Sequence, residues 1–325
     1  MRAIVQDTYG DADVLVLRDV DRPAPAPGEA LVRVVAAGVD PGVWHMMTGK
    51  PYLMRAATGL RRPRVRIRGR DLAGVVEAVG AGVARLRPGD EVYGTCSGGS
   101  FAEYATAPAA RLAPKPANLS FEQAAAVPVS GTTALQAVRD GAGVRAGQRV
   151  LIIGAGGGIG TYAVQIAAAT GAEVTGVCSG AKAGLVRSLG AGDVIDYTTE
   201  EVDARGPVFD AIIDVAGSRP VSLLRRALAA RGTLVVIGGE DRGTAFLGGI
   251  SRPWIAAPLA SLVSGKRLRG LLAKENSADL EALTELIESG TLRPAVQRTF
   301  PLSGAPEAVR LIGSGHTTGK LVVTI

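Results

Sequence analysis

Hydrophobic and polar residues alternate along the first 120 residues in short runs that end at turn residues. Runs of this kind lie at 1–6, 14–20, 29–39, 71–80, 91–94 and 101–106. The breaks between them include the Pro-rich stretch 23–28 and the turn 87–90, Arg-Pro-Gly-Asp. Short alternating runs between such breaks predict antiparallel strands, with at most one short helix, at 41–48.

From about Ser120 the pattern changes, and short apolar runs alternate with helical segments. Ser120 and Gln123 have the spacing of a capping box, which starts a helix. Strands are then predicted at 149–153, 173–178, 193–196, 210–215, 233–237 and 267–273, with helices at 158–170, 182–189 and 220–230. Apolar strands that alternate with helices are typical of a parallel, doubly wound sheet. We therefore predict an α/β protein with a Rossmann domain.

The last 50 residues or so contain too few elements for a domain of their own. They predict helices at 280–289 and 305–312, an extended run at 292–300 and a strand at 320–325. We expect these elements to complete the first domain. The predicted domains are therefore residues 1–120 with 278–325, and residues 121–277.

Composition adds limits to this picture. The 325 residues can bury two ordinary cores. The net charge of +6 fits an anionic ligand such as a dinucleotide phosphate, general basicity, or weak binding to nucleic acid. Cys96 and Cys178 stand far apart without metal-ligand spacing, which favours two reduced, buried thiols. No signal peptide or membrane span is recognised, so we expect a cytoplasmic protein.

The strongest chemical signal is a glycine-rich stretch between the strand at 149–153 and the helix at 158–170. Glycines there let the backbone approach a pyrophosphate, and the helix N-terminus offers free N–H groups. The stretch is not a strict GxGxxG, because Ala155 occupies the first glycine position. Its place between strand and helix argues against a merely flexible loop. The predicted phosphate-binding residues are Ala155, Gly156, Gly157, Gly158, Ile159 and Gly160.

The end of the next strand predicts which nucleotide binds. NAD-binding domains carry an Asp or Glu there for the ribose 2′-hydroxyl, whereas this strand ends Val-Cys-Ser-Gly at 177–180. Ser179 and Lys182 follow it, and Tyr197 ends the strand after that. A hydroxyl, an ammonium and a phenol suit a 2′-phosphate, and the sequence indicates no carboxylate to repel it. The alternative for Lys182 is a solvated surface charge. We predict a preference for NADPH.

Several further motifs, in order, resemble the medium-chain dehydrogenase/reductase superfamily over the whole chain. Residues 69–80 resemble its GHExxGxVxxVG stretch, and residues 87–92 its RPGDxV turn. Residues 98–104 resemble its GxxAEY strand, residues 127–135 its domain-junction helix, and residues 315–320 its GHxxGK ending. This resemblance implies a GroES-like first domain beside the Rossmann domain.

The chain departs from zinc-dependent members of that superfamily at their ligand positions. Asp40 lies in the Gly-Val-Asp stretch 38–40, where a ligand Cys would stand, and Arg70 replaces a ligand His. A guanidinium cannot ligate zinc. The chain therefore resembles the zinc-free quinone oxidoreductase branch, and within it a subgroup of bacterial and organellar NADPH oxidoreductases. The resemblance implies hydride transfer to a quinone or an α,β-unsaturated carbonyl, whose conjugation carries the developing charge.

Four residues are candidates for the acceptor site. Tyr52 follows the first-domain helix where related reductases carry an aromatic residue; alternatively it is a partly buried loop aromatic. His45 is a candidate proton donor, although a structural histidine is favoured slightly. Arg70 could pair with Asp40 or Asp71, bind an anionic substrate, or be structural. Asp40 replaces the usual Asn of the branch.

Further cofactor contacts are carried over by position from the resemblance. They lie after the fourth and fifth predicted strands, in the junction helix, before the helix near residue 278, and in the C-terminal segment. These residues are Thr132, Thr133, Ala216, Gly217, Gly238, Gly239, Leu271, Leu272 and Lys320.

The arginine-rich segment 61–70 leaves a rival interpretation open. Arg64, Arg66 and Arg68 alternate with apolar residues, which predicts an extended strand with one solvated basic face. A patch for RNA or acidic lipid is the alternative, but no aromatic residues interleave the arginines, so we do not expect a nucleic-acid partner. A non-catalytic NADPH sensor is the other alternative. By analogy, an edge strand at 233–237 and the apolar segment 246–262 predict a homodimer.

Overall fold

The computed structural model describes residues 1–237 and 265–325, and they form two compact units. Unit 1 comprises Met1–Thr132 with Glu275–Ile325, and unit 2 comprises Thr133–Lys274. The C-terminal segment thus belongs to the first unit. The first boundary lies 12 residues beyond the expected one, because the helix that follows the Ser120 capping box packs on strands of unit 1.

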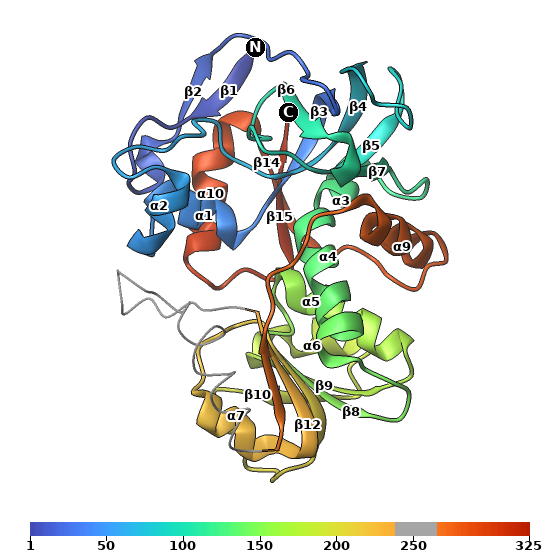
Figure 1. Ribbon diagram of the computed structural model, residues 1–325. Helices are drawn as coiled ribbons and strands as arrows, with labels where there is room; N and C mark the ends of the chain where they lie inside the picture. Colours follow the sequence, from blue (N-terminus) through green and yellow to red (C-terminus); the bar gives the residue numbers. More distant parts are fainter. Residues whose placement is uncertain (238–264) are drawn as a thin grey trace. The chain divides into compact units, whose positions relative to one another are not determined.

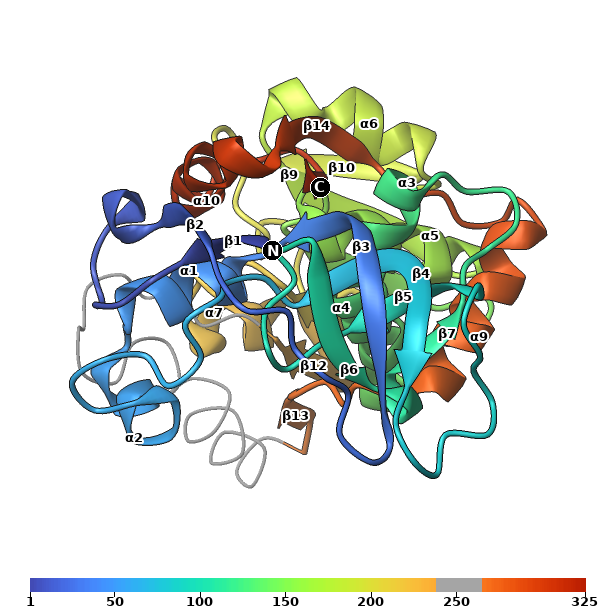
Figure 2. The same cartoon turned by 90° about the horizontal axis from the view of Figure 1, so that it is seen from above.

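Unit 1 is built on a mainly antiparallel sheet. The order of its strands is β14-β15-β3-β4-β5-β7, and β6 also pairs with β3. Only β14 and β15 run parallel to each other. Figure 2 shows β3, β4 and β5 side by side. The bounds are β3 Glu29–Val39, β4 Asp71–Val79, β5 Glu91–Thr95, β6 Tyr104–Pro108, β7 Leu112–Pro114, β14 Val296–Pro301 and β15 Lys320–Thr324, with a separate pair of β1 Arg2–Val5 and β2 Val16–Asp19.

Three helices of unit 1 begin at a residue whose side chain caps the helix, namely Asp40, Ser120 and Asn276. Helix α1 follows Asp40, whose carboxylate accepts the Gly42 N–H at 2.7 Å. It lies against α10 (Figure 1), and a Cβ at Gly313 would come within 2.5 Å of the Trp44 indole. The close packing of these two helices therefore requires glycine. The helices are α1 Pro41–Thr48, α2 Arg55–Thr58, α3 Phe121–Ala125, α9 Ser277–Glu288 and α10 Ala305–Gly313, and α4 Pro128–Gln136 crosses the boundary between the units.

Unit 2 contains a parallel sheet with the strand order β10-β9-β8-β11-β12-β13 (Figure 1). In chain order this is 3-2-1-4-5-6, the order of a dinucleotide-binding Rossmann sheet, which binds its ligand at the carboxyl ends of the strands. The α/β prediction is confirmed. The bounds are β8 Arg149–Ile153, β9 Glu173–Cys178, β10 Asp193–Asp196, β11 Phe209–Asp214, β12 Leu228–Val236 and β13 Arg267–Gly270, with helices α5 Gly158–Ala169, α6 Ala183–Ser188 and α7 Val221–Ala227 and a π-helix at Ala137–Ala142.

The structure corrects the expected edge strand. Strand β12 pairs with β11 on one side and β13 on the other, so it is internal and cannot pair across a two-fold axis. It also begins at Leu228, which ends the preceding helix earlier than predicted. Gly238, Gly239 and the segment 246–262 lie outside the described residues.

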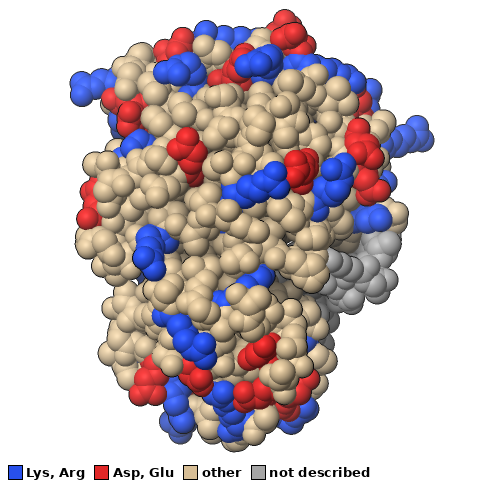
Figure 3. Space-filling model, turned by 180° about the vertical axis from the view of Figure 1, so that it is seen from behind, with Lys and Arg blue, Asp and Glu red and all other residues tan. Residues whose placement is uncertain are grey.

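The arginine-rich segment 61–70 is not the predicted strand. Only Ile67 forms a bridge, with Val5, and Gly59 and Gly69 have φ values of 121° and 91°, which interrupt an extended run. Arg66 pairs with Asp7 at 2.5 Å, whereas Arg68 is buried. The arginines therefore do not share one solvated face, which removes the geometric basis for an RNA patch. On the face drawn in Figure 3, basic and acidic side chains are interspersed.

Candidate active site

The glycine loop of unit 2 has the geometry of a pyrophosphate cradle. It leaves β8 and enters α5 at Gly157, whose helix start has no side-chain cap. The first N–H groups of this 12-residue helix are therefore available to an anion, which the helix dipole also favours. Gly160 leaves no room for a side chain, since a Cβ there would collide with the Gly154 carbonyl oxygen and lie 2.7 Å from the Ala155 Cα. These features fit a dinucleotide phosphate.

The residues predicted for the 2′-phosphate lie together at the ends of β9 and β10. Cys178 and Asp196 are register partners, and the Tyr197 N–H donates to the Cys178 carbonyl at 3.2 Å. Ser179 and Lys182 follow β9 directly, and the Lys182 stem lies over Gly156, where a Cβ would be 2.8 Å from its Cδ. The structure thus brings Lys182 beside the glycine loop.

The structure adds a cation that the sequence analysis missed. The Arg219 guanidinium lies 5.9 Å from the centre of the Tyr197 ring. Arg219 stands in the loop after β11, whose carboxyl end shares an edge with those of β8 and β9. That shared edge is the signal that could have identified it, because all such loops approach one ligand.

Asp196 corrects the expectation that no carboxylate lies near this site. Its carboxylate accepts the Thr198 N–H at 3.0 Å and the Thr198 hydroxyl at 2.8 Å. The backbone and side-chain hydrogen bonds from Thr198 and the backbone of Gly180 lower the pKa of Asp196, so it is ionised at neutral pH. An ionised carboxylate therefore stands at the end of β10, directly before Tyr197.

The other positions carried over for the cofactor lie mostly at the same edge of unit 2. Ala216 and Gly217 follow β11, and a Cβ at Gly154 would lie 3.3 Å from the Ala216 nitrogen. Leu271 and Leu272 follow β13, and Leu272 is 75% exposed. Thr132 and Thr133 are buried in α4. Their contacts with a cofactor stay predictions.

Lys320, also predicted to contact the cofactor, forms a buried ion pair in unit 1. Its Nζ donates to Asp71 Oδ2 at 3.2 Å and to Ser130 Oγ at 3.0 Å. Lys320 is 2% exposed and Asp71 is 0% exposed. Asp71 Oδ1 also accepts the Val129 N–H at 3.0 Å. The side chain therefore ties β15 to β4 and α4, and its contact with a cofactor stays a prediction.

Burial controls the electrostatics of this pair. It raises the pKa of Asp71 to about 6, and the nearby Lys320 counteracts part of that rise. Space for the carboxylate comes from Gly38, where a Cβ would lie 2.7 Å from Asp71 Oδ2. Gly38, in the stretch 38–40 that resembles a zinc-ligand site, thus leaves room for the buried carboxylate of Asp71.

Three of the four acceptor-site candidates have defined local roles. Asp40 caps α1 through Oδ1, and its buried Oδ2 has no partner among the described residues. His45 Nδ1 lies 2.9 Å from the Lys50 carbonyl, so Nδ1 carries the hydrogen. Tyr52 is 42% exposed, with the Arg55 guanidinium 4.6 Å from its ring centre. The hydroxyl of Tyr52 thus remains available as a donor to an acceptor oxygen.

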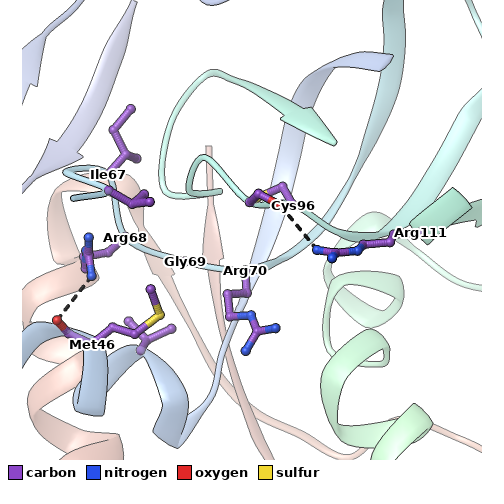
Figure 4. A pocket seen from close by; sticks show the side chains of 10 residues that line it. Met46, Ile67, Arg68, Gly69, Arg70, Cys96 and Arg111 are labelled. Carbon is purple, nitrogen blue, oxygen red and sulfur yellow. Dashed lines mark hydrogen bonds between the residues drawn. The ribbon is translucent and has the colours of Figure 1, made fainter. Parts of the chain in front are cut away.

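Arg70, the fourth candidate, pairs with neither Asp40 nor Asp71, which corrects that expectation. It donates to Glu275, which also accepts a hydrogen bond from Thr95 Oγ1 at 3.0 Å and forms an ion pair with Arg111 Nη1 at 3.0 Å. Arg70 lines a pocket of about 220 Å³ in unit 1 (Figure 4). The pocket is lined by Val43, Met46, Val65, Ile67, Arg68, Gly69, Arg70, Cys96, Ser97 and Arg111.

The described residues contain no group of three His, Cys, Asp or Glu side chains that could hold a metal ion. Cys96 and Cys178 are free and buried, as the sequence predicted. Within residues 1–237 and 265–325, no helix has the length and apolar character needed to cross a membrane.

The fold and the glycine loop define a two-unit nucleotide-dependent oxidoreductase, and known proteins place it in a family. The family described as "Alcohol dehydrogenase GroES-like domain" matches residues 26–117. The family described as "Zinc-binding dehydrogenase" matches residues 189–323. The GroES-like prediction for the first domain is confirmed. The name of the second family refers to zinc, whereas this chain carries Arg70 at a ligand position.

Individual relatives match over nearly the full length. The mitochondrial NAD(P)H oxidoreductase RTN4IP1 of Bos taurus is 33% identical, covering 100% of this chain and 89% of that protein. The quinone oxidoreductase from Coxiella burnetii superimposes with a TM-score of 0.86 at 31% identity, over 100% and 99% of the two chains. A mycobacterial protein solved with NADPH gives 0.84 at 26% identity, over 100% of both chains.

This chain belongs to the zinc-free quinone oxidoreductase-like branch of the medium-chain dehydrogenase/reductase superfamily. It is an NAD(P)H oxidoreductase by family, and proteins named as quinone oxidoreductases are among its relatives.

Proposed function

We propose that this chain transfers hydride from NADPH to a conjugated acceptor, either a quinone or an α,β-unsaturated carbonyl compound, without zinc. The observation that carries the proposal is the cluster of Ser179, Lys182 and Tyr197 beside the glycine loop, with Arg219 near Tyr197. The structural neighbour solved with NADPH supports the same nucleotide.

The residues of each unit have separate tasks in this proposal. The first N–H groups of α5 bind the pyrophosphate, and Lys182 with Arg219 binds the 2′-phosphate. Thr132, Thr133, Leu271 and Leu272 orient the nicotinamide, which supplies the hydride when bound. In unit 1, Tyr52 or Arg70 donates a hydrogen bond to the acceptor oxygen, where negative charge develops. A conjugated acceptor needs no stronger electrophile, because charge spreads from the attacked carbon to that oxygen.

The test is NADPH oxidation, followed by absorbance, with quinones, enones and simple aldehydes, each with and without a chelator. We expect chelator-resistant turnover of quinones or enones and little turnover of simple aldehydes. Tight NADPH binding without turnover of any acceptor would instead favour a non-catalytic sensor. Activity that a chelator abolishes would contradict the zinc-independent mechanism.

Replacing Lys182 by Ala should weaken NADPH binding about 10-fold, the usual order for one charge-assisted hydrogen bond to a phosphate. NADH binding should change little, because NADH has no phosphate at that position. The measurement is the ratio of the two dissociation constants by calorimetry. Arg187→Ala, at an exposed position in helix α6, which directly follows Lys182, is the control. An equal loss for both nucleotides would assign Lys182 to the fold of the glycine loop instead.

The cytoplasmic location and the homodimer stay predictions. Light scattering at micromolar concentration tests the second of them, and a monomer there would remove it.

A further inference from the structure

The pocket of unit 1 carries more positive than negative charge. Arg68, Arg70 and Arg111 line it (Figure 4), and Glu275 is the carboxylate that Arg70 and Arg111 share. Asp71, the residue after Arg70, is already paired with Lys320. Among the residues that the structure describes, three guanidinium groups against one carboxylate leave two more positive than negative charges around this pocket.

The Arg68 guanidinium has no carboxylate partner among the described residues. It is 2% exposed, and its Nη1 donates to the Met46 carbonyl at 3.3 Å. Its Nε and Nη2 are buried and have no hydrogen-bond partner among the described residues. A buried guanidinium with two nitrogens that lack a hydrogen-bond partner is costly for a fold, and a nearby anion relieves that cost.

Arg70 and Arg111 are positioned to make the direct contact. Their side chains are 39% and 37% exposed, so solvent and a ligand can reach them. In Figure 4 the two guanidinium groups extend into the same region, with the Arg111–Ser97 hydrogen bond of 3.3 Å beside them. Each guanidinium has five N–H donors, more than Glu275 and Ser97 use.

The rest of the pocket is apolar and small. Val43, Met46, Val65 and Ile67 supply its hydrophobic lining. A volume of about 220 Å³ is below the usual range for drug-sized ligands, so it accommodates one end of a substrate. An apolar lining beside an arginine cluster fits a carboxylate attached to a hydrocarbon group, since planar guanidinium groups match carboxylates well.

We propose that this pocket binds the carboxylate of an acidic substrate, so that the preferred acceptor is an α,β-unsaturated carbonyl compound with a free carboxylate. This inference rests on the proposed function. In the reaction, the C=C bond of the acceptor gains a hydride at its β-carbon and a proton from water at its α-carbon. The nicotinamide loses two electrons with that hydride and is oxidised. The carboxylate is unchanged and serves to hold the substrate.

The test compares two acceptors that differ only in charge, trans-β-benzoylacrylate and its methyl ester, with NADPH as the reductant. For the wild type, kcat/KM should be about 10-fold higher for the acid, the size expected for a charge-assisted contact. Arg111→Met and Arg68→Met should each remove most of that preference through KM, and Arg111→Lys should restore part of it. Arg87→Met, at an exposed arginine outside the pocket, should keep the preference.

Binding of the saturated acid β-benzoylpropionate, measured by calorimetry, separates this inference from the proposed function. Binding that Arg111→Met weakens, without turnover of either acceptor, would support the anion pocket and overturn the reductase proposal. Equal turnover of acid and ester, unchanged in Arg111→Met, would overturn the anion pocket and leave the reductase proposal standing. Absence of both binding and turnover would overturn both. Arg111 is partly exposed, so its variants test the inference even if Arg68→Met fails to fold.

Discussion

Lys320→Met should lower the free energy of unfolding by about 3–5 kcal/mol at about pH 8, the cost of removing one partner of a buried ion pair. The substitution leaves the carboxylate of Asp71 buried, with the Val129 N–H as its one remaining partner among the described residues. It also removes the hydrogen bond to Ser130 that joins β15 to α4. Urea unfolding followed by tryptophan fluorescence measures the loss. A Trp254→Phe background leaves Trp44 of unit 1 as the only tryptophan.

The cost of Lys320→Met should grow as the pH rises. Burial already raises the pKa of Asp71 to about 6 in the wild type, and Lys320 counteracts that rise. Without Lys320 the folded-state pKa is higher still, whereas the unfolded-state pKa keeps its ordinary value. A raised carboxyl pKa gives stability that is lost as the pH rises through it. The wild type therefore stops losing stability above about pH 6, while the variant continues to lose it.

Two controls separate the ion pair from general damage. The double variant Asp71→Asn with Lys320→Met removes both charges and should lose less stability than Lys320→Met alone, because no unpaired charge remains. Lys50→Met, at an exposed lysine, should change the free energy of unfolding by about 0.5 kcal/mol or less. A pH-independent loss in Lys320→Met, equal to that of the double variant, would show that the pair is not ionised.

The local elements of this fold follow closely from the sequence. The strand at Glu29–Val39 and the helix at Pro41–Thr48 have the predicted bounds, because a Val-rich run ends at a capping Asp and a proline at the helix start. The capping box at Ser120 and Gln123 forms as the spacing indicates. The bounds of the parallel strand Arg149–Ile153 also equal the predicted ones, because its continuous apolar run lies between a charged residue and a glycine.

Tertiary placement of charged residues did not follow from the sequence in the same way. Arg68 belongs to a pattern that alternates like a strand, but only an isolated bridge forms there, at Ile67, and the Arg68 side chain is buried. Lys320 and Asp71 are 249 positions apart, and only the antiparallel pairing of β15, β3 and β4 brings them together. Glu275 likewise reaches Arg70 through the fold, so the sequence suggested nearer acids instead.

The candidate cofactor site was more predictable than the acceptor site for a physical reason. A parallel sheet fixes the edge at which all strand ends meet, so residues such as Ser179 and Tyr197 could be placed from strand order alone. That same rule, applied to the register of β9 and β10, also places Asp196 beside them, which the sequence analysis overlooked. The acceptor-site candidates lie in and around short helices and loops of unit 1, where no comparable rule fixes a side chain.

Gly160→Ala should raise the dissociation constant for NADPH about 10- to 100-fold, which corresponds to about 1.4–2.8 kcal/mol. The new methyl group would collide with the Gly154 carbonyl and lie 2.7 Å from the Ala155 Cα. These are backbone atoms of the glycine loop, so the strain is relieved only by moving the loop away from the start of α5. The amides that bind the pyrophosphate would then no longer converge. Calorimetric titration with NADPH measures the change.

A matched substitution shows whether this effect comes from the collision or from alanine itself. Gly184 lies in helix α6 with no atom within 4 Å of its Cβ position. Gly184→Ala should therefore keep the affinity for NADPH and raise the free energy of unfolding by up to about 1 kcal/mol, because alanine favours a helix over glycine. If Gly160→Ala and Gly184→Ala bind NADPH with equal affinity, the assignment of the glycine loop as the pyrophosphate site is contradicted. A parallel loss of affinity for NADPH and NADH in Gly160→Ala would support it, since both nucleotides carry the same pyrophosphate.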